Sequence, residues 1–99
     1  MLYVTTQPEA LSATAATLAG VGAMMSAQNA AAAAPTAGVF PAAADEVSVL
    51  VATQFAVHAQ MYQAISAQAE AIHQQFVSTL EMSATSYAAT EVANAIAAS

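Results

Sequence analysis

The residues that break helices lie only in the first part of this chain, and this feature most limits what it can fold into. No glycine or proline follows Pro41 in a chain of 99 residues. Pro8 suits the first turn of a helix, where its missing N–H costs no intrahelical bond. Two prolines and a glycine cluster within 35–41. The pattern predicts a helix over about 7–34, a connector at 35–41 and a longer helix over about 42–82.

The composition favours helices but not a large core. Alanine occupies 30 of the 99 positions; it is the best helix former, yet its side chain buries little apolar area. There is no cysteine, so no disulfide and no thiolate metal site can brace the fold. Because a short connector favours antiparallel neighbours, the predicted fold is a single all-α domain, an antiparallel two-helix hairpin with a thin core.

The charge balance excludes several classes of function. Lysine and arginine are absent, and six acids give a net charge of −6. Phosphate contacts rest on Lys and Arg, so we expect no nucleic-acid binding and no electrostatic attraction to anionic lipid. The uncharged stretch 10–34 is long enough to span a bilayer, but it is mostly alanine with scattered Ser, Thr, Gln and Asn. No transmembrane segment or cleaved signal peptide is therefore expected.

The first helix carries a narrow row of apolar residues. Thr6 and Glu9 have the spacing of a capping box, which predicts that they satisfy the first free N–H groups. Gly20 and Gly22 weaken the helix, and we expect them to permit close approach of a neighbouring backbone. Larger apolar residues recur at the seven-residue spacing of helix pairs, at Val4, Leu11, Leu18 and Met25.

The second helix has more apolar surface than one neighbour can cover. Asp45 and Glu46 suit its first turn, and after Leu80 the composition shifts to Ser and Thr, which predicts a weaker tail over 83–99. Its main stripe is Val51, Phe55, His58, Tyr62, Ile65, Ala69, Ile72, Phe76 and Leu80. A second edge comprises Val47, Leu50, Val57, Met61 and Val77. A lone hairpin would leave much of this apolar surface exposed to solvent. We therefore expect a bundle completed by another chain, either a second copy or a different protein.

No residue pattern predicts catalysis, a cofactor or a metal site. His58 and His73 are fifteen residues apart, which on one helix is roughly 22 Å and too far to share a metal. His58 falls on the apolar stripe and is predicted to lie in an interface. Glu70 and His73 match the Glu-x-x-His half-site of di-iron bundles, but the further glutamates are missing. No serine has the setting of a nucleophile, so we predict a non-enzyme.

Four stretches, in order, resemble the mycobacterial PE family over the length of one domain. They are Val4-Thr-Thr-Gln-Pro-Glu-Ala-Leu11, Ala27-Gln-Asn-Ala-Ala-Ala-Ala-Ala-Pro35, Pro41-Ala-Ala-Ala-Asp-Glu-Val-Ser48 and Ser86-Tyr-Ala-Ala-Thr-Glu91. Pro8 and Glu9 match the dipeptide that names the family. The opening Met1-Leu2-Tyr3 departs from the usual Met-Ser-Phe. The resemblance implies a single PE domain over 1–99, without a C-terminal extension.

The resemblance also implies a partner and a route out of the cell. PE proteins pair with PPE proteins in a four-helix bundle and are exported by type VII (ESX) secretion systems. The C-terminal signal Tyr-x-x-x-Asp/Glu of the family is matched by Tyr87 and Glu91. An EspG-type chaperone is expected on the PPE partner, and the sequence looks most like PE proteins of the fifth ESX system. The expected location is secreted, at the cell surface or in the envelope, after a transient cytoplasmic stage.

The predicted partner interface combines the apolar row of the first helix with the stripe of the second. Its residues are Leu11, Leu18, Met25, Val51, Phe55, His58, Tyr62, Ile65, Ile72 and Phe76. The alternative hypothesis is a homo-oligomeric helical protein that associates with the envelope or a membrane through the same apolar faces.

Overall fold

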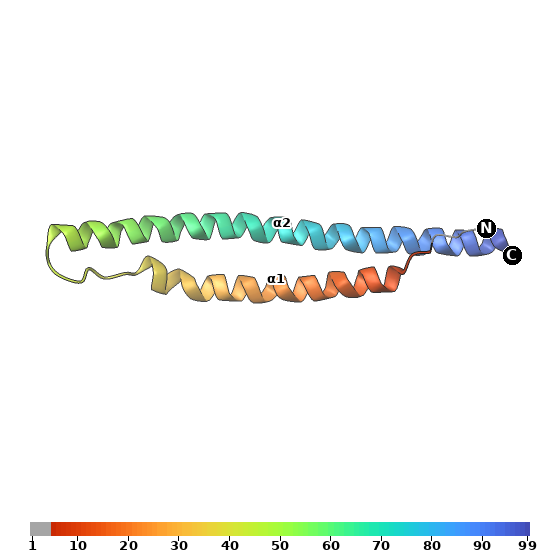
Figure 1. Cartoon of the computed structure of the whole chain (residues 1–99), viewed down its shortest axis with the longest axis horizontal. Coiled ribbons are helices and arrows are strands. Elements are labelled where there is room, and N and C mark those ends of the chain that lie inside the picture. The colour runs from red at the N-terminus through yellow and green to blue at the C-terminus, as the bar shows by residue number, and fades with distance from the viewer. Residues whose placement is uncertain (1–4) are drawn as a thin grey trace. The chain divides into compact units, whose positions relative to one another are not determined.

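Two long helices make up almost all of the described structure. The structure is a computed structural model that describes residues 5–99. Val4 of the predicted apolar row of the first helix lies outside the described residues. Helix α1 spans Pro8–Ala37 and helix α2 spans Glu46–Ala98, and no strand occurs over the described range (Figure 1). The all-α prediction is confirmed, and the two helices are consistent with a hairpin.

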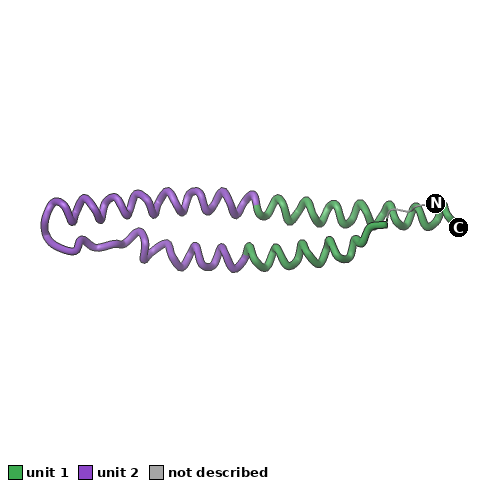
Figure 2. The backbone as a smooth tube through the Cα atoms, in the orientation of Figure 1, with its two compact units in different colours: residues 1–22, 73–99 green, residues 23–72 purple. Residues whose placement is uncertain are grey.

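The chain divides into two compact units, each containing part of both helices (Figure 2). Unit 2 comprises Ala23–Ile72, which is the end of α1, the connector and the start of α2. Its buried residues are small: Ala52, Ala59 and Ser66. Unit 1 pairs the beginning of α1, up to Gly22, with His73–Ser99, which holds the end of α2. Its buried residues are Ala15, Val77 and Ala84.

Helix α1 begins one residue later than a capping box at Thr6 requires. The carbonyl of Gln7 accepts hydrogen bonds from the N–H groups of Ala10 and Leu11, at 3.0 and 3.2 Å, so Gln7 is the cap and Pro8 the first helical residue. The Thr6 hydroxyl donates instead to Glu91. The predicted capping box between Thr6 and Glu9 is therefore wrong.

The end of α1 also differs from the prediction. The helix continues through Pro35 to Ala37, three residues past the predicted end at 34. Proline leaves the carbonyl of Ala31 without its usual donor, but Ala31 is exposed and water can replace that bond. The Thr36 hydroxyl donates to the carbonyl of Ala32 at 2.6 Å and adds support in the last turn. The connector therefore covers 38–45 and not 35–41.

Helix α2 starts at Glu46, four residues after the predicted start, because Asp45 caps it. The N–H of Ser48 donates to Oδ1 of Asp45 at 2.7 Å, and the N–H of Val49 donates to the Asp45 carbonyl at 3.2 Å. The hydrogen bonds from Ser48 lower the pKa of the Asp45 carboxyl below its ordinary value of 3.8.

At its far end α2 extends past the predicted limit of about 82 and includes most of the predicted tail. The helix is unbroken to Ala98. The hydroxyls of Thr79, Thr85 and Thr90 each donate to the backbone carbonyl four residues earlier, at 2.9, 3.1 and 3.0 Å. Since these hydroxyls are satisfied within the helix, the Ser/Thr-rich composition does not end it.

Candidate interaction surfaces and signal face

The two helices meet along small and polar side chains in unit 2, and a few aliphatic side chains join them in unit 1. We call this row of least exposed α2 residues the seam. In unit 2 it comprises Ala52, Ala56, Ala59, Gln63, Ser66 and Glu70, and in unit 1 His73, Val77, Leu80 and Ala84. The steps alternate between four and three, which is the spacing of helix-pair contacts. The least exposed residues of α1 face this row. They are Leu11, Ala15, Leu18 and Gly22 in unit 1, and Asn29, Ala32 and Ala33 in unit 2.

The predicted apolar stripe of α2 lies one residue before the seam at almost every step. One residue corresponds to about 100° around an α-helix, so the bulky side chains point away from α1. We call this set the outer face. Phe55 is 56% exposed, and the other large members are similarly open to solvent: Val51, Tyr62, Ile65, Ile72 and Phe76. Leu80 is the exception, because the step from Phe76 is four residues and carries it into the seam.

The predicted interface residues of α1 fall into two groups. Leu11 and Leu18 are half-buried within unit 1, where they belong to the contact with α2. Met25 in unit 2 is 44% exposed, beside the more exposed Met24. Most of the predicted second edge of α2 is exposed as well, but Val77 is buried in the seam of unit 1. The period of seven therefore identified one helix face without showing which neighbour covers it.

Gly22 makes room for the imidazole of His73 in unit 1. A Cβ built on Gly22 would lie 2.7 Å from Cδ2 and 2.9 Å from Nε2 of His73. The same Nε2 lies 2.6 Å from the carbonyl oxygen of Leu18, to which a protonated Nε2 donates. Gly20 has no atom within 4 Å of such a Cβ. The predicted close approach thus occurs at Gly22 alone, and a side chain rather than a backbone fills the space.

Asn29 is the centre of a polar cluster in unit 2. Its Nδ2 donates to Oε1 of Glu70 at 3.0 Å, and its Oδ1 accepts from the hydroxyl of Tyr62 at 3.1 Å. The side chain of Gln63 donates to the Asn29 backbone carbonyl at 3.1 Å. Three residues of α2 thus recognise one residue of α1. A polar residue in a helix contact fixes the register, because sliding would leave its partners unpaired.

The two histidines and Glu70 do not form a metal site among the described residues. Glu70 accepts from Asn29 and His73 bonds Leu18, so each member of the Glu-x-x-His motif has a partner of its own. Within residues 5–99 no three His, Cys, Asp or Glu side chains gather as metal ligands would. His58 is exposed and lines a shallow groove of unit 2 with Pro35, Thr36, Val39, Phe55, Ala59 and Tyr62.

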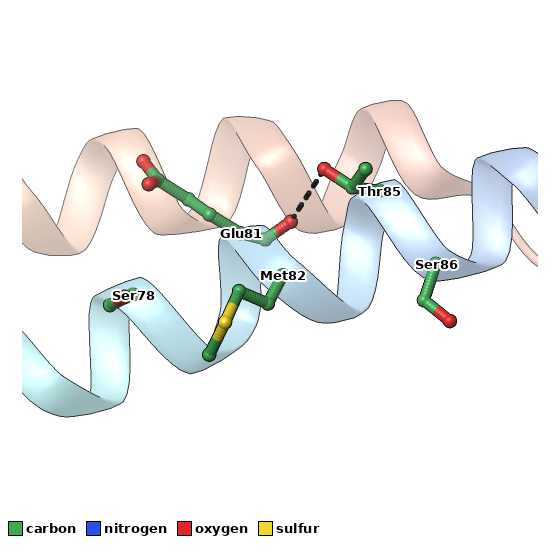
Figure 3. A pocket seen from close by; sticks show the side chains of 5 residues that line it. All are labelled: Ser78, Glu81, Met82, Thr85 and Ser86. Atoms are coloured by element: carbon green, nitrogen blue, oxygen red, sulfur yellow. Dashed lines mark hydrogen bonds between the residues drawn. The ribbon is translucent and has the colours of Figure 1, made fainter.

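A second hollow lies along α2 in unit 1. Ser78, Glu81, Met82, Thr85 and Ser86 line it, and all five come from α2 (Figure 3). The Thr85 hydroxyl is occupied by its bond to the Glu81 carbonyl. A hollow formed by successive turns of one helix encloses nothing and converges no polar groups on a ligand.

Tyr87 and Glu91 lie one turn apart on α2, within unit 1. Tyr87 is 46% exposed and Glu91 is half-buried. Residues at this spacing share one side of a helix. Oε1 of Glu91 accepts a hydrogen bond from the Thr6 hydroxyl at 2.9 Å. The motif is therefore part of an ordered helix, and no local sequence signal predicted its contact with Thr6.

The dipeptide Pro8-Glu9 forms the first turn of α1. Pro8 is half-buried, and Glu9 is exposed at the positive end of the helix dipole. Neither residue lines the groove of unit 2 or the hollow along α2. Both fit the start of a helix, which is a structural role.

The fold and these surfaces define a small helical protein whose apolar residues face outward. The family model that matches it is "PE family", over residues 4–94. The PE family protein PE13 of Mycobacterium tuberculosis is 65% identical over 99 residues, which is all of both chains. The chain belongs to the PE family of mycobacteria.

Other relatives from the same organism are longer. PE family protein PE8 is 52% identical over 98 residues, which are 36% of its length. PE-PGRS family protein PE_PGRS33 is 56% identical over 95 residues, which are 19% of its length. The chain thus spans the whole of PE13 but only a minor part of these larger proteins.

Proposed function

We propose that this chain is a non-enzymatic PE protein that pairs with a PPE protein in a four-helix bundle. The pair leaves the cell through a type VII (ESX) secretion system, and Tyr87 and Glu91 form the export signal. An EspG-type chaperone acts on the PPE partner before export. The destination is the cell surface, the envelope or the medium, and the fifth ESX system is the proposed route.

The observation that carries this proposal is the orientation of the bulky apolar residues. In unit 2 the helices meet through small and polar side chains, and in unit 1 a few aliphatic residues such as Leu18 and Val77 join them, whereas the outer face remains in solvent in both units. Burial is worth roughly 25 cal/mol per Å² of apolar area, so this face is a large reserve of free energy that the chain alone does not use. A pair of helices from another protein would cover it, as in a four-helix bundle. Membership of the PE family makes a PPE protein the expected partner.

Co-expression tests the pairing. The chain alone should aggregate or show helical signal without a cooperative thermal transition. With a PPE protein from the same host it should give a soluble 1:1 complex that melts sharply. A monodisperse monomer with a sharp transition of its own would contradict the proposal.

Export is tested separately in the native host. Tyr87→Ala and Glu91→Ala should leave the complex in the lysate at its normal level and remove the chain from the envelope and medium. Glu91→Asp should be exported, because the family signal accepts either acid. Normal export of both alanine variants would contradict the proposed signal.

A second candidate function is self-association at a membrane. It is favoured by α1, whose 30 residues have a mean hydropathy of 1.4 in their most apolar window and are long enough to cross a bilayer. The hydroxyls of Thr14 and Thr17 bond to backbone carbonyls, which reduces their polarity. A lone chain found in the membrane fraction, or a soluble oligomer of this chain only, would favour this candidate over pairing with PPE.

A further inference from the structure

We propose that Thr6 is a positioning residue for the export signal, so that the signal is built from both ends of the chain. The inference rests on the proposed function of Glu91. It starts from one contact: the Thr6 hydroxyl donates to Oε1 of Glu91 at 2.9 Å, across 85 residues of sequence. Both side chains are half-buried within unit 1.

The contact constrains a side chain that would otherwise be free. A glutamate on a helix surface samples many rotamers, and ordering such a side chain costs up to about 2 kcal/mol. A hydrogen bond to an ionised carboxylate is stronger than one between neutral groups. The bond from Thr6 therefore prepays part of the ordering of Glu91. The bond engages Oε1 of the carboxylate, which has a second oxygen to offer a receptor.

The local structure leaves Thr6 available for this role. Because Gln7 caps α1, the hydroxyl of Thr6 is not needed by the first turn. Thr6 lies two residues before Pro8, where α1 begins, and the half-buried Leu11 and buried Ala15 hold the first turns of α1 in unit 1. Thr6 consequently reaches Glu91 only when α1 is docked on α2.

This geometry couples recognition to folding. Tyr87 and Glu91 share one side of α2 whenever the helix forms, but Glu91 is held in place only in the paired unit. A receptor that needs the ordered carboxylate would bind a folded chain better than an unfolded one, because it would not have to order that side chain itself. The signal then depends on the folded state of the chain as well as on the sequence motif.

The test uses matched variants in the native host, with complex measured in the lysate and exported chain measured in the medium and envelope. Thr6→Val keeps the shape and removes the hydroxyl, and we expect about fivefold lower export, as the loss of one net hydrogen bond implies. Thr6→Ser restores the donor and should restore export. The control is Thr5→Val, since Thr5 is exposed and its side chain bonds no described residue; it should export normally.

The outcomes separate this inference from the proposed function. If Glu91→Ala is exported normally, the proposed signal itself fails. If Glu91→Ala is blocked but Thr6→Val is exported normally, the role of Thr6 alone is refuted. Equal loss with Thr5→Val, or loss of the complex in Thr6→Val, would also refute it. The double variant Thr6→Val/Glu91→Ala should be no worse than Glu91→Ala, because both changes remove the same interaction.

Discussion

The seam and the outer face of α2 differ in what they contribute, although they lie about 100° apart on the same helix. The seam consists mostly of small and polar residues, and some of them recognise particular atoms of α1, as Glu70 recognises Asn29. The outer face consists of large apolar residues such as Phe55 that remain about half exposed, although the Tyr62 hydroxyl reaches Asn29 of α1. Shape and hydrogen bonds therefore specify how the two helices of this chain pair, while most of the large apolar side chains of α2 remain exposed to solvent.

The largest expected effect is on the outer face. Phe55→Ala should destabilise the complex by about 2–4 kcal/mol, because it removes a large side chain from the proposed interface and leaves a cavity. Phe55 is a cleaner choice than Tyr62, whose hydroxyl also bonds Asn29 within the chain. The measurement is the melting temperature and yield of the co-expressed complex.

The control for Phe55 is another phenylalanine that lies off the helix. Phe40 is in the connector and 90% exposed. Phe40→Ala loses the same side chain and should leave the complex unchanged. Equal loss of stability in both variants, or none in either, would break the distinction between the outer face and the rest of the exposed apolar surface.

The next effect tests the close approach in the seam of unit 1. Gly22→Ala gains helix propensity but places a methyl group 2.7 Å from the His73 ring, so the net destabilisation should be about 1–3 kcal/mol. Gly20→Ala has open space and should stabilise the helix by about 0.5–1 kcal/mol. Thermal melting of the two complexes measures the difference. Shifts of the same sign would mean that His73 moves aside at little cost, and the seam would then be less specific than its geometry indicates.

A smaller effect is expected from the polar cluster of unit 2. Asn29→Ala leaves Glu70 and Tyr62 without their partner and should cost about 1–2 kcal/mol. The neighbouring exposed Gln28 provides the control, because Gln28→Ala touches none of these groups. Hydrogen exchange of the complex would show whether the loss is confined to residues near the cluster. Unchanged protection in Asn29→Ala would remove the cluster from the residues that set the register.

The sequence predicted the class of fold and the large apolar residues of the stripe, because both follow from strong local signals. The absence of glycine and proline after Pro41 predicted the long α2, and the spacing of residues such as Phe55 predicted an apolar stripe, but not that this stripe faces away from α1. The ends of both helices were misplaced. At Pro35 the helix tolerates a breaker in its exposed last turn, and at Asp45 a cap, not a first-turn residue, decides where α2 begins.

The seam could not be found by looking for hydrophobic periodicity, because most of its members are small or polar. A row of small residues at alternating steps of four and three, beginning Ala52, Ala56, Ala59, was the available signal. Which residues meet across the pair is a further step. The contacts of His73 with Gly22 and of Thr6 with Glu91 depend on the relative register of two distant segments within unit 1, and a register set by tertiary packing leaves no local pattern.

The smallest expected effect is at the start of α2, where one exposed carboxylate belongs to neither face. The hydrogen bonds from Ser48 lower the pKa of Asp45 below its ordinary value of 3.8 in the folded chain. A lowered folded-state pKa means that this cap contributes stability above pH 3.8, and that the contribution is lost as the pH falls below that value. Asp45→Asn keeps an acceptor for the Ser48 N–H but cannot titrate, so its complex should lose less stability than the wild type over that window. Melting temperatures of both complexes from neutral pH down to about pH 3 measure this. Parallel curves would show that the cap does not contribute to acid sensitivity.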